Sequence, residues 1–178
     1  MPGKITPFLW FDHQAEQAAK FYVSVFKKGS KITSVSRYGD AGPGPKGSVM
    51  TVGFRLAGQE FTALNAGPVF KFTPAISFVV SCATQKEVDT YWRKLSSVPE
   101  AEQCGWLQDK YGLSWQIVPN FIHEAVNAKD QEKSNRVMQA LLSMKKLDIK
   151  TLKAAAAAAA GPKGRAPGTK QRGKASGR

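Results

Sequence analysis

The chain has 178 residues, of which 42% are hydrophobic, so it is long enough for one packed domain or for two small repeats fused into one. Its apolar runs stay well short of the roughly 20 residues that a membrane-spanning helix needs. The net charge is +13, but residues 161–178 carry six basic side chains and no acidic one, which leaves +7 on the first 160 residues. Two cysteines do not make a disulfide framework, and the start of the chain does not resemble a signal peptide, so we expect a cytoplasmic protein without membrane contact.

The first half begins with a strand-like run, TPFLWF, at Thr6. A helical pattern follows, and Asp12 stands where it could cap that helix. After a strand-like run at 31–39 come a Gly/Pro loop at 40–47 and two further runs, at 48–56 and 59–67, joined by a turn at 57–58. One face of the helix is predicted to be buried and consists of Ala15, Ala18, Ala19, Tyr22, Val25 and Phe26.

The second half repeats this order weakly, beginning with TPAISFVV at Thr73. Thr84, with Glu87 three residues later, predicts a capping box at the start of the second helix. A short strand near 100–104 is expected next, then a hairpin of 105–110 and 113–119 that turns at Tyr111-Gly112. The buried face of the second helix is predicted to hold Val88, Tyr91, Trp92 and Leu95. The two halves are therefore predicted to be β-α-β-β-β modules, at about 4–67 and 73–119.

Residues 121–153 are predicted to form one or two C-terminal helices, and the apolar face of 137–142 suits either a dimer contact or a cap on the chain's own sheet. The alanine run that ends at Ala160 should extend the last helix. We place the end of the domain near 153 and expect the Gly-, Pro-, Lys- and Arg-rich tail, within 154–178, to be disordered. Its six positive charges predict weak, non-specific contact with nucleic acid, or simply a solubilising tail.

Four stretches resemble the PhnB-like branch of the vicinal oxygen chelate superfamily, which includes glyoxalase I, extradiol dioxygenases and bleomycin-resistance proteins. They are PFLWFDHQAEQAAKFYVSVF (7–26), RYGDAGPGPKGSVMTVGFRLAGQEFTALNAGP (37–68), AISFVV (75–80) and QCGWLQDKYGLSWQIVP (103–119). The resemblance covers about 4–153 and implies an α+β fold in which the two modules form a curved mixed sheet around a cleft. It also implies a homodimer and a small-molecule ligand.

This branch is often labelled 3-demethylubiquinone-9 3-methyltransferase-like, but the sequence has no Gly-rich strand-to-helix turn for S-adenosylmethionine. The superfamily's enzymes bind a divalent metal through His and Glu side chains at four strand positions. By the resemblance, these positions fall at Ile5, near Ala75, within 62–65 and at Gln116, none of which is a His or a carboxylate. We therefore expect neither a metal ion nor another cofactor.

The remaining polar candidates are interpreted as surface groups. His13 and His123 are expected to be solvated. Glu100, Glu102 and Asp109 are likewise expected at the surface, where most carboxylates lie.

The alternation of the last strand places Gln116 on one face and Trp115 on the other. The resemblance assigns Gln116 to the cleft, so Trp115 is predicted to pack under the helices. Trp106 either lines the cleft or belongs to the core, and Cys104 is either a reactive thiol or, as its acidic neighbours favour, a buried and inert one. Phe72 lies in a segment that is either a lid or a linker between the modules. The candidate ligand-binding residues are thus Asn65, Phe72, Cys104, Trp106 and Gln116.

Three functions follow from these observations. The first is a small-molecule binding protein, or an enzyme of unknown substrate, that works without a metal in an apolar and amide-lined cleft. The second is a metal-dependent glyoxalase- or dioxygenase-type enzyme. The third is a nucleic-acid-associated protein that uses its basic tail. The sequence favours the first and does not decide whether the protein is catalytic.

Overall fold

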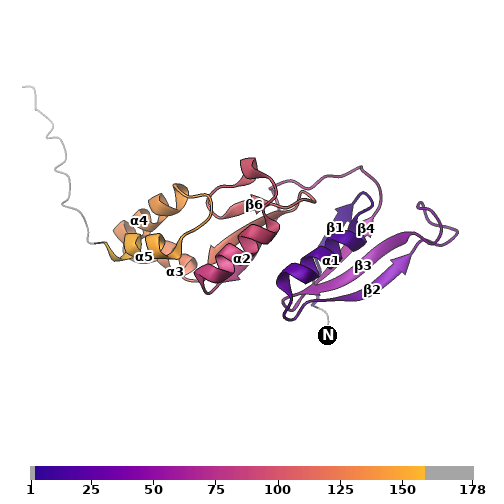
Figure 1. Ribbon diagram of the computed structural model, residues 1–178, viewed down its shortest axis with the longest axis horizontal. Helices are drawn as coiled ribbons and strands as arrows, with labels where there is room; N and C mark the ends of the chain where they lie inside the picture. Colours follow the sequence, from indigo (N-terminus) through magenta and orange to yellow (C-terminus); the bar gives the residue numbers. More distant parts are fainter. Residues whose placement is uncertain (1–2, 159–178) are drawn as a thin grey trace, which may run out of the picture.

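The computed structural model describes residues 3–158, which form two successive modules and a group of C-terminal helices. Figure 1 shows each module as a sheet with one long helix lying along one of its faces. The first module has the predicted order of strand, helix and three strands. Its elements are β1 (Phe8–Phe11), α1 (Ala15–Phe26), β2 (Lys31–Arg37), β3 (Val49–Leu56) and β4 (Gln59–Asn65).

The second module is shorter than predicted. The strand expected near 100–104 is instead a 3-10 helix, η1, and an isolated bridge between Gln103 and Trp106. The proline at the start of η1 favours this turn over an extended strand. The module consists of β5 (Ser77–Cys82), α2 (Gln85–Leu95), η1 (Pro99–Ala101), β6 (Trp106–Gln108) and β7 (Ser114–Pro119).

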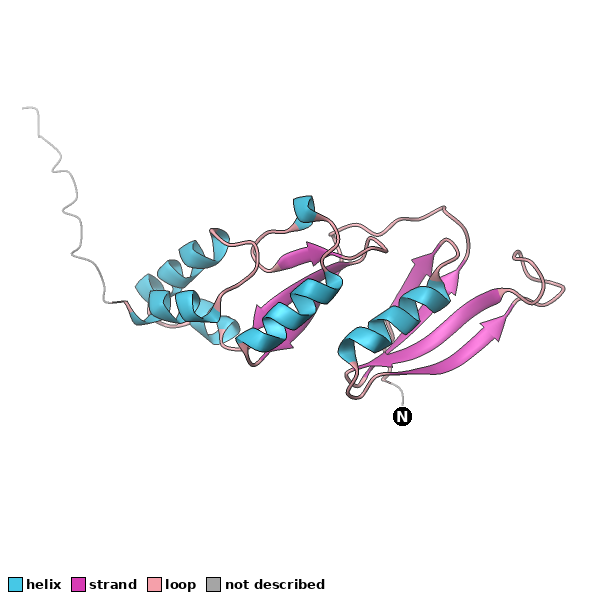
Figure 2. Ribbon diagram, viewed as in Figure 1, coloured by secondary structure: helices cyan, strands magenta, loops and turns pink. Residues whose placement is uncertain are grey.

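The strands form two mixed sheets, ordered β1-β4-β3-β2 and β5-β7-β6 (Figure 2). In each sheet the first strand pairs in parallel with the last strand of the module, whereas the other pairs are antiparallel. Apart from the strand that the second module lacks, both modules share one strand plan, and the α+β class with tandem modules is confirmed. α1 packs on β3 and β4, and α2 packs on β7, so among the described residues each sheet has its long helix on one face, and we call the opposite face helix-free.

Helix α1 buries the face that its periodicity predicted, since Ala15, Ala18, Ala19, Tyr22 and Val25 are all buried. The predicted cap is wrong, because Asp12 makes no capping bond and the residue at the cap position is Gln14. The first amide of the helix, from Ala15, instead donates to Oδ1 of Asn65 at 2.8 Å. Helix α2 begins as predicted, with the Thr84 hydroxyl accepting from the amide of Glu87 at 3.2 Å.

Aromatic side chains join the two modules into one core. Trp115 is buried, as predicted, and its ring lies 5.4 Å from that of Tyr22 in α1. Phe61 of β4 and Phe78 of β5 meet edge to face at 5.1 Å. The prediction of a surface position for Asp109 is wrong, since its exposed fraction is 1%. The carboxylate is buried because it accepts from Trp115 Nε1 and from two amides of its own turn.

The C-terminal part holds three helices: α3 (Ile122–Val126), α4 (Gln131–Leu142) and α5 (Ile149–Ala157). Helix α5 runs four residues past the predicted domain end at 153, as the propensity of the alanine run suggests. Val137 of α4 is buried in a small separate core, whereas Met138 and Leu142 are exposed. The basic tail from 159 lies outside the described residues, so its disorder and its contact with nucleic acid stay predictions. Within 3–158, helices that could cross a membrane are absent.

Candidate functional site

The five predicted ligand-binding residues separate into different places. Cys104 and Trp106 line one cavity, and Gln116 lies directly beside it. Asn65 lines a second cavity, in the first module. Phe72 lines neither of these two cavities, and its half-buried ring packs edge to face on Phe11 at 5.2 Å.

The first cavity, which we call the Trp106 cavity, has a volume of about 490 Å³. Its lining combines residues of β6 and β7 with Ala101 of η1 and Leu142 at the end of α4. Charged side chains of the described residues are absent from its lining. The walls include Pro74, Gln103, Cys104, Trp106, Gln108 and Leu142.

Gln116 lies on the same helix-free face as Trp106, because the two residues are direct partners in the β6/β7 register. Val79 of β5 is the partner of Gln116 on its other side and is exposed. The Gln116 amide nitrogen donates to the Ser77 hydroxyl at 2.9 Å, which fixes the side chain and leaves its Oε1 as an acceptor. An indole, an amide and an apolar side chain thus form one row across the sheet.

Cys104 is not the buried residue that we expected, since it is partly exposed. Its φ of 52° and that of Gly105, 85°, place two successive residues in the left-handed region, where the chain turns into β6. Its thiol lies 3.8 Å from the carbonyl of Leu142 in α4. Cys82 is the buried cysteine, and burial raises the pKa of its thiol to about 12, so that thiol is unreactive.

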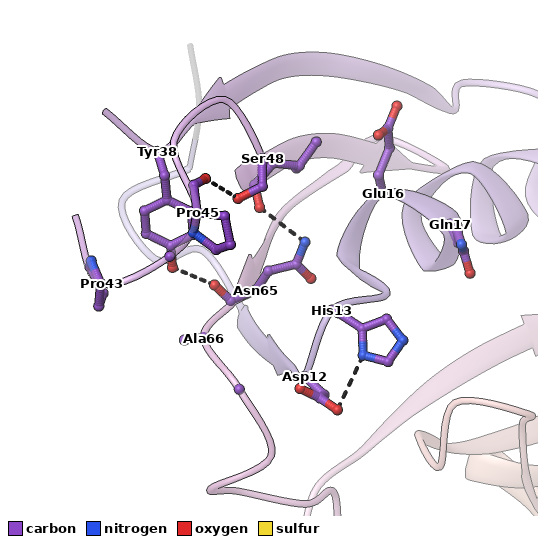
Figure 3. Close-up of a pocket in the computed structure, with 13 residues that line it drawn as sticks. Asp12, His13, Glu16, Gln17, Tyr38, Pro43, Pro45, Ser48, Asn65 and Ala66 are labelled. Carbon is purple, nitrogen blue, oxygen red and sulfur yellow. Dashed lines mark hydrogen bonds and ion pairs between the residues drawn. The ribbon is translucent and has the colours of Figure 1, made fainter. Parts of the chain in front are cut away.

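The second cavity, which we call the N-terminal cavity, has a volume of about 550 Å³. The loop before α1, the loop between β2 and β3, and the end of β4 enclose it (Figure 3). Asp12 and His13 lie at one end and Tyr38 and Pro45 at the other, with Asn65 between them. The Asp12 carboxylate pairs with Nδ1 of His13 at 3.1 Å, and both side chains are solvent-exposed.

The side chain of Asn65 holds the structure around this cavity together. Its Oδ1 accepts from Ala15 and its Nδ2 donates to the carbonyl of Val49 at 3.1 Å. The buried Tyr38 hydroxyl donates to the Asn65 carbonyl oxygen at 2.5 Å. Asn65 therefore connects β4, the start of α1 and the hairpin of β2 and β3, and its amide is already satisfied without a ligand.

Sequence reasoning missed Tyr38 and the purpose of the Gly/Pro loop that follows it. A Cβ at Gly42 would lie 2.5 Å from Cδ1 of Tyr38, and one at Gly44 would overlap the opposite ring edge. The loop therefore encloses the ring and needs glycine at both contacts. The available signal was an aromatic residue directly before a loop in which glycine and proline alternate.

The residues at the superfamily's metal positions do not fit a divalent metal ion. Ile5 is an exposed apolar side chain, and the Asn65 amide is committed to two backbone partners. Gln116 offers one neutral oxygen, which is a weak ligand. Across 3–158, no three His, Cys, Asp or Glu side chains gather in an arrangement that could hold a metal. His13 and His123 are both exposed, as expected.

Comparison with known proteins gives a family match. The family model described as 3-demethylubiquinone-9 3-methyltransferase matches residues 3–118. A solved PhnB protein from Bacillus cereus is 43% identical, with a TM-score of 0.56 over 66% of this chain and 99% of that one. A Pseudomonas aeruginosa protein, 16% identical, has a TM-score of 0.52 over 66% and 97% of the two chains and shows the fold alone. The search of curated proteins gives no match.

Proposed function

Since the chain belongs to the 3-demethylubiquinone-9 3-methyltransferase family, with its PhnB-like, glyoxalase-like fold, we propose that it binds a small organic molecule without a divalent metal ion. The proposed site is the Trp106 cavity together with Gln116. One observation carries the proposal: the Trp106 indole and the Gln116 amide are direct partners on the helix-free face, beside a cavity of about 490 Å³. This volume lies in the range of about 300–1,000 Å³ that is typical of ligand pockets.

The lining of this cavity suits a neutral, planar ligand. An indole offers a flat face for stacking, which favours an aromatic ring system. Gln103, Gln108 and Gln116 can donate or accept hydrogen bonds, and the described residues place no charge in the lining to balance a charged ligand. A ligand with a ring and a few neutral polar groups therefore fits best.

The name of the family does not extend the proposal to methyl transfer. S-adenosylmethionine commonly binds a Gly-rich turn between a strand and a helix of a parallel sheet. In the described part of the chain each sheet has a single parallel pair, and the connection from β1 to α1 is Asp12-His13-Gln14, without glycine. These residues do not fit that cofactor.

We also propose that the protein is a homodimer. Four exposed apolar side chains lie on or next to β1 and β5, each of which pairs with one strand only in the described structure. Covering them with a second copy would remove apolar surface from water, as an isologous interface does. They are Ile5, Phe8, Ile76 and Val79. Light scattering of wild type and Phe8→Glu tests this: a dimer that the variant converts to a monomer is expected, and a monomeric wild type would contradict it.

The binding proposal is tested by calorimetry on the full chain in the presence of a chelator. Indole, 2-naphthol and benzamide serve as neutral planar probes, and benzoate serves as a charged counterpart. We expect a neutral probe to bind, Trp106→Ala to weaken it at least about tenfold, and Gln116→Ala to weaken it less. Val35→Ala, an exposed strand residue outside the cavity, is the control. Equal affinity of the probe for wild type and Trp106→Ala would contradict the assignment of the binding site to this cavity.

A further inference from the structure

We propose that the N-terminal cavity is a second binding site, which takes a small organic cation: an ammonium group on an apolar or aromatic body. This cavity shares none of its lining residues with the Trp106 cavity. It lies in the first module, between α1, β4 and the hairpin of β2 and β3. The inference does not depend on a ligand in the Trp106 cavity. Three observations carry it: the fixed apolar wall, the carboxylates in the lining, and the Ala15 amide that Asn65 already occupies.

The wall opposite the charges is rigid and largely apolar. Tyr38 is buried, its hydroxyl is held by the Asn65 carbonyl, and Gly42 and Gly44 contact its ring from the loop. Pro43 and Pro45 add surfaces with little conformational freedom. Figure 3 shows Pro45 and Tyr38 on the same side of the cavity, away from Asp12 and His13. A preformed wall of this kind can accept the apolar body of a ligand without paying to order itself.

The lining contains two carboxylates, Asp12 and Glu16, beside the imidazole of His13, and Lys or Arg side chains of the described residues are absent from it. The negative charge of these two carboxylates is opposite in sign to the chain's net charge of +13. The Asp12 carboxylate has the exposed imidazole of His13 as its partner. Glu16 pairs with Lys20 one turn along the helix at 2.6 Å, and this pair lowers the pKa of Glu16, which keeps it ionised. Because Lys20 and Arg37 offset the charge of Glu16, the Asp12 carboxylate is the group that we expect to receive a cation.

An anion is disfavoured although the cavity touches the start of a helix. Such a site offers free amide hydrogens to an anion. Here the Ala15 amide is already bound by Asn65, and the carboxylates of Asp12 and Glu16 line the same cavity. An anion at this end of the cavity would have to approach the Asp12 and Glu16 carboxylates. The ammonium of a cation can instead approach the Asp12 carboxylate directly, with its apolar body toward Tyr38.

The test is a titration of the full chain with phenethylammonium and with 2-phenylethanol, its neutral counterpart, followed by ligand-observed NMR. We expect the amine to bind at least about tenfold more tightly than the alcohol, and more weakly as salt is raised. Asp12→Asn should weaken the amine at least about tenfold. Glu100→Gln, at an exposed carboxylate outside the cavity, should leave it unchanged.

Equal binding of amine and alcohol would overturn the proposal, as would undiminished binding to Asp12→Asn or no binding of the amine to wild type. Trp106→Ala separates this site from the other one. Amine binding that Trp106→Ala abolishes and Asp12→Asn leaves intact would place the amine in the Trp106 cavity and also overturn the inference.

Discussion

Asp109 accepts a hydrogen bond from the indole Nε1 of Trp115 at 2.8 Å inside the core that joins the two modules. The same carboxylate accepts from the amides of Tyr111 and Leu113, which closes the hairpin between β6 and β7. Tyr22 of α1 lies beside it, and burial together with this negative charge raises the pKa of the Tyr22 hydroxyl. One side chain therefore fixes the turn, the buried indole and the contact with α1.

Replacing Asp109 by Ala should lower the free energy of unfolding by about 3 kcal/mol or more, because one indole and two amide donors lose their buried acceptor. Urea unfolding followed by circular dichroism measures the change. Asp40→Ala, which removes an exposed carboxylate paired with Lys46, is the control and should have an effect within about 1 kcal/mol. A loss for Asp109→Ala no larger than that of the control would contradict the structural role.

The stabilisation by Asp109 should depend on pH. Burial raises the pKa of Asp109 above its ordinary value of 3.8 in spite of its hydrogen bonds. The folded state therefore binds more protons than the unfolded state between the two pKa values, and stability falls as pH rises through this window. The difference in unfolding free energy between wild type and Asp109→Ala should be largest below pH 3.8 and decrease as the pH rises above that value. A difference that grows with pH would contradict the sign.

The Gly/Pro loop gives a matched pair of substitutions. Gly44→Ala places a methyl group against the Tyr38 ring and should cost about 1–3 kcal/mol of stability by overpacking. Gly39→Ala, in the same segment, meets nothing within 4 Å and should be near neutral. Thermal unfolding of both variants makes the comparison. Equal melting temperatures would mean that the loop does not enclose the ring.

Asn65 can be tested against Asp12 as the residue that holds the start of α1. Asn65→Ala removes the acceptor for the Ala15 amide and the donor to Val49, so it should cost about 1–2 kcal/mol. Asp12→Ala should be near neutral for stability, because its side chain makes no capping bond. Urea unfolding measures the loss of stability in the two variants. A larger loss for Asp12→Ala than for Asn65→Ala would contradict this account and support Asp12 as the helix cap that the sequence predicted.

Regular patterns in the sequence predicted the parts of the fold that depend on local periodicity. The buried face of α1 follows from a spacing of 3.6 residues, and the start of α2 follows from a capping box. Strand alternation placed Trp115 opposite Gln116, and the family resemblance then predicted which of the two faces is buried. The turn at Asp109 also had a local signal, since Gly112 follows the Asp three residues later. We nevertheless predicted a surface position for Asp109, because most carboxylates in proteins are exposed.

The cavities could be predicted only in part, because their walls come from distant segments. Strand alternation left Trp106 either in the cleft or in the core, and the β6/β7 register pairs it with Gln116. The cap that Asn65 provides for Ala15 spans 50 residues, so no local pattern could reveal it. The exposure of Cys104 follows from two left-handed residues, a conformation that is uncommon for a residue other than glycine.

The most direct test of metal-independent binding is elemental analysis of the full chain purified without a chelator, with thermal shift in micromolar Ni²⁺, Zn²⁺ and Mn²⁺. We predict no stoichiometric metal and no change in melting temperature, because the superfamily's ligand positions hold an isoleucine and amide side chains. A stoichiometric metal, or stabilisation by several degrees, would contradict this account and support a glyoxalase-type enzyme.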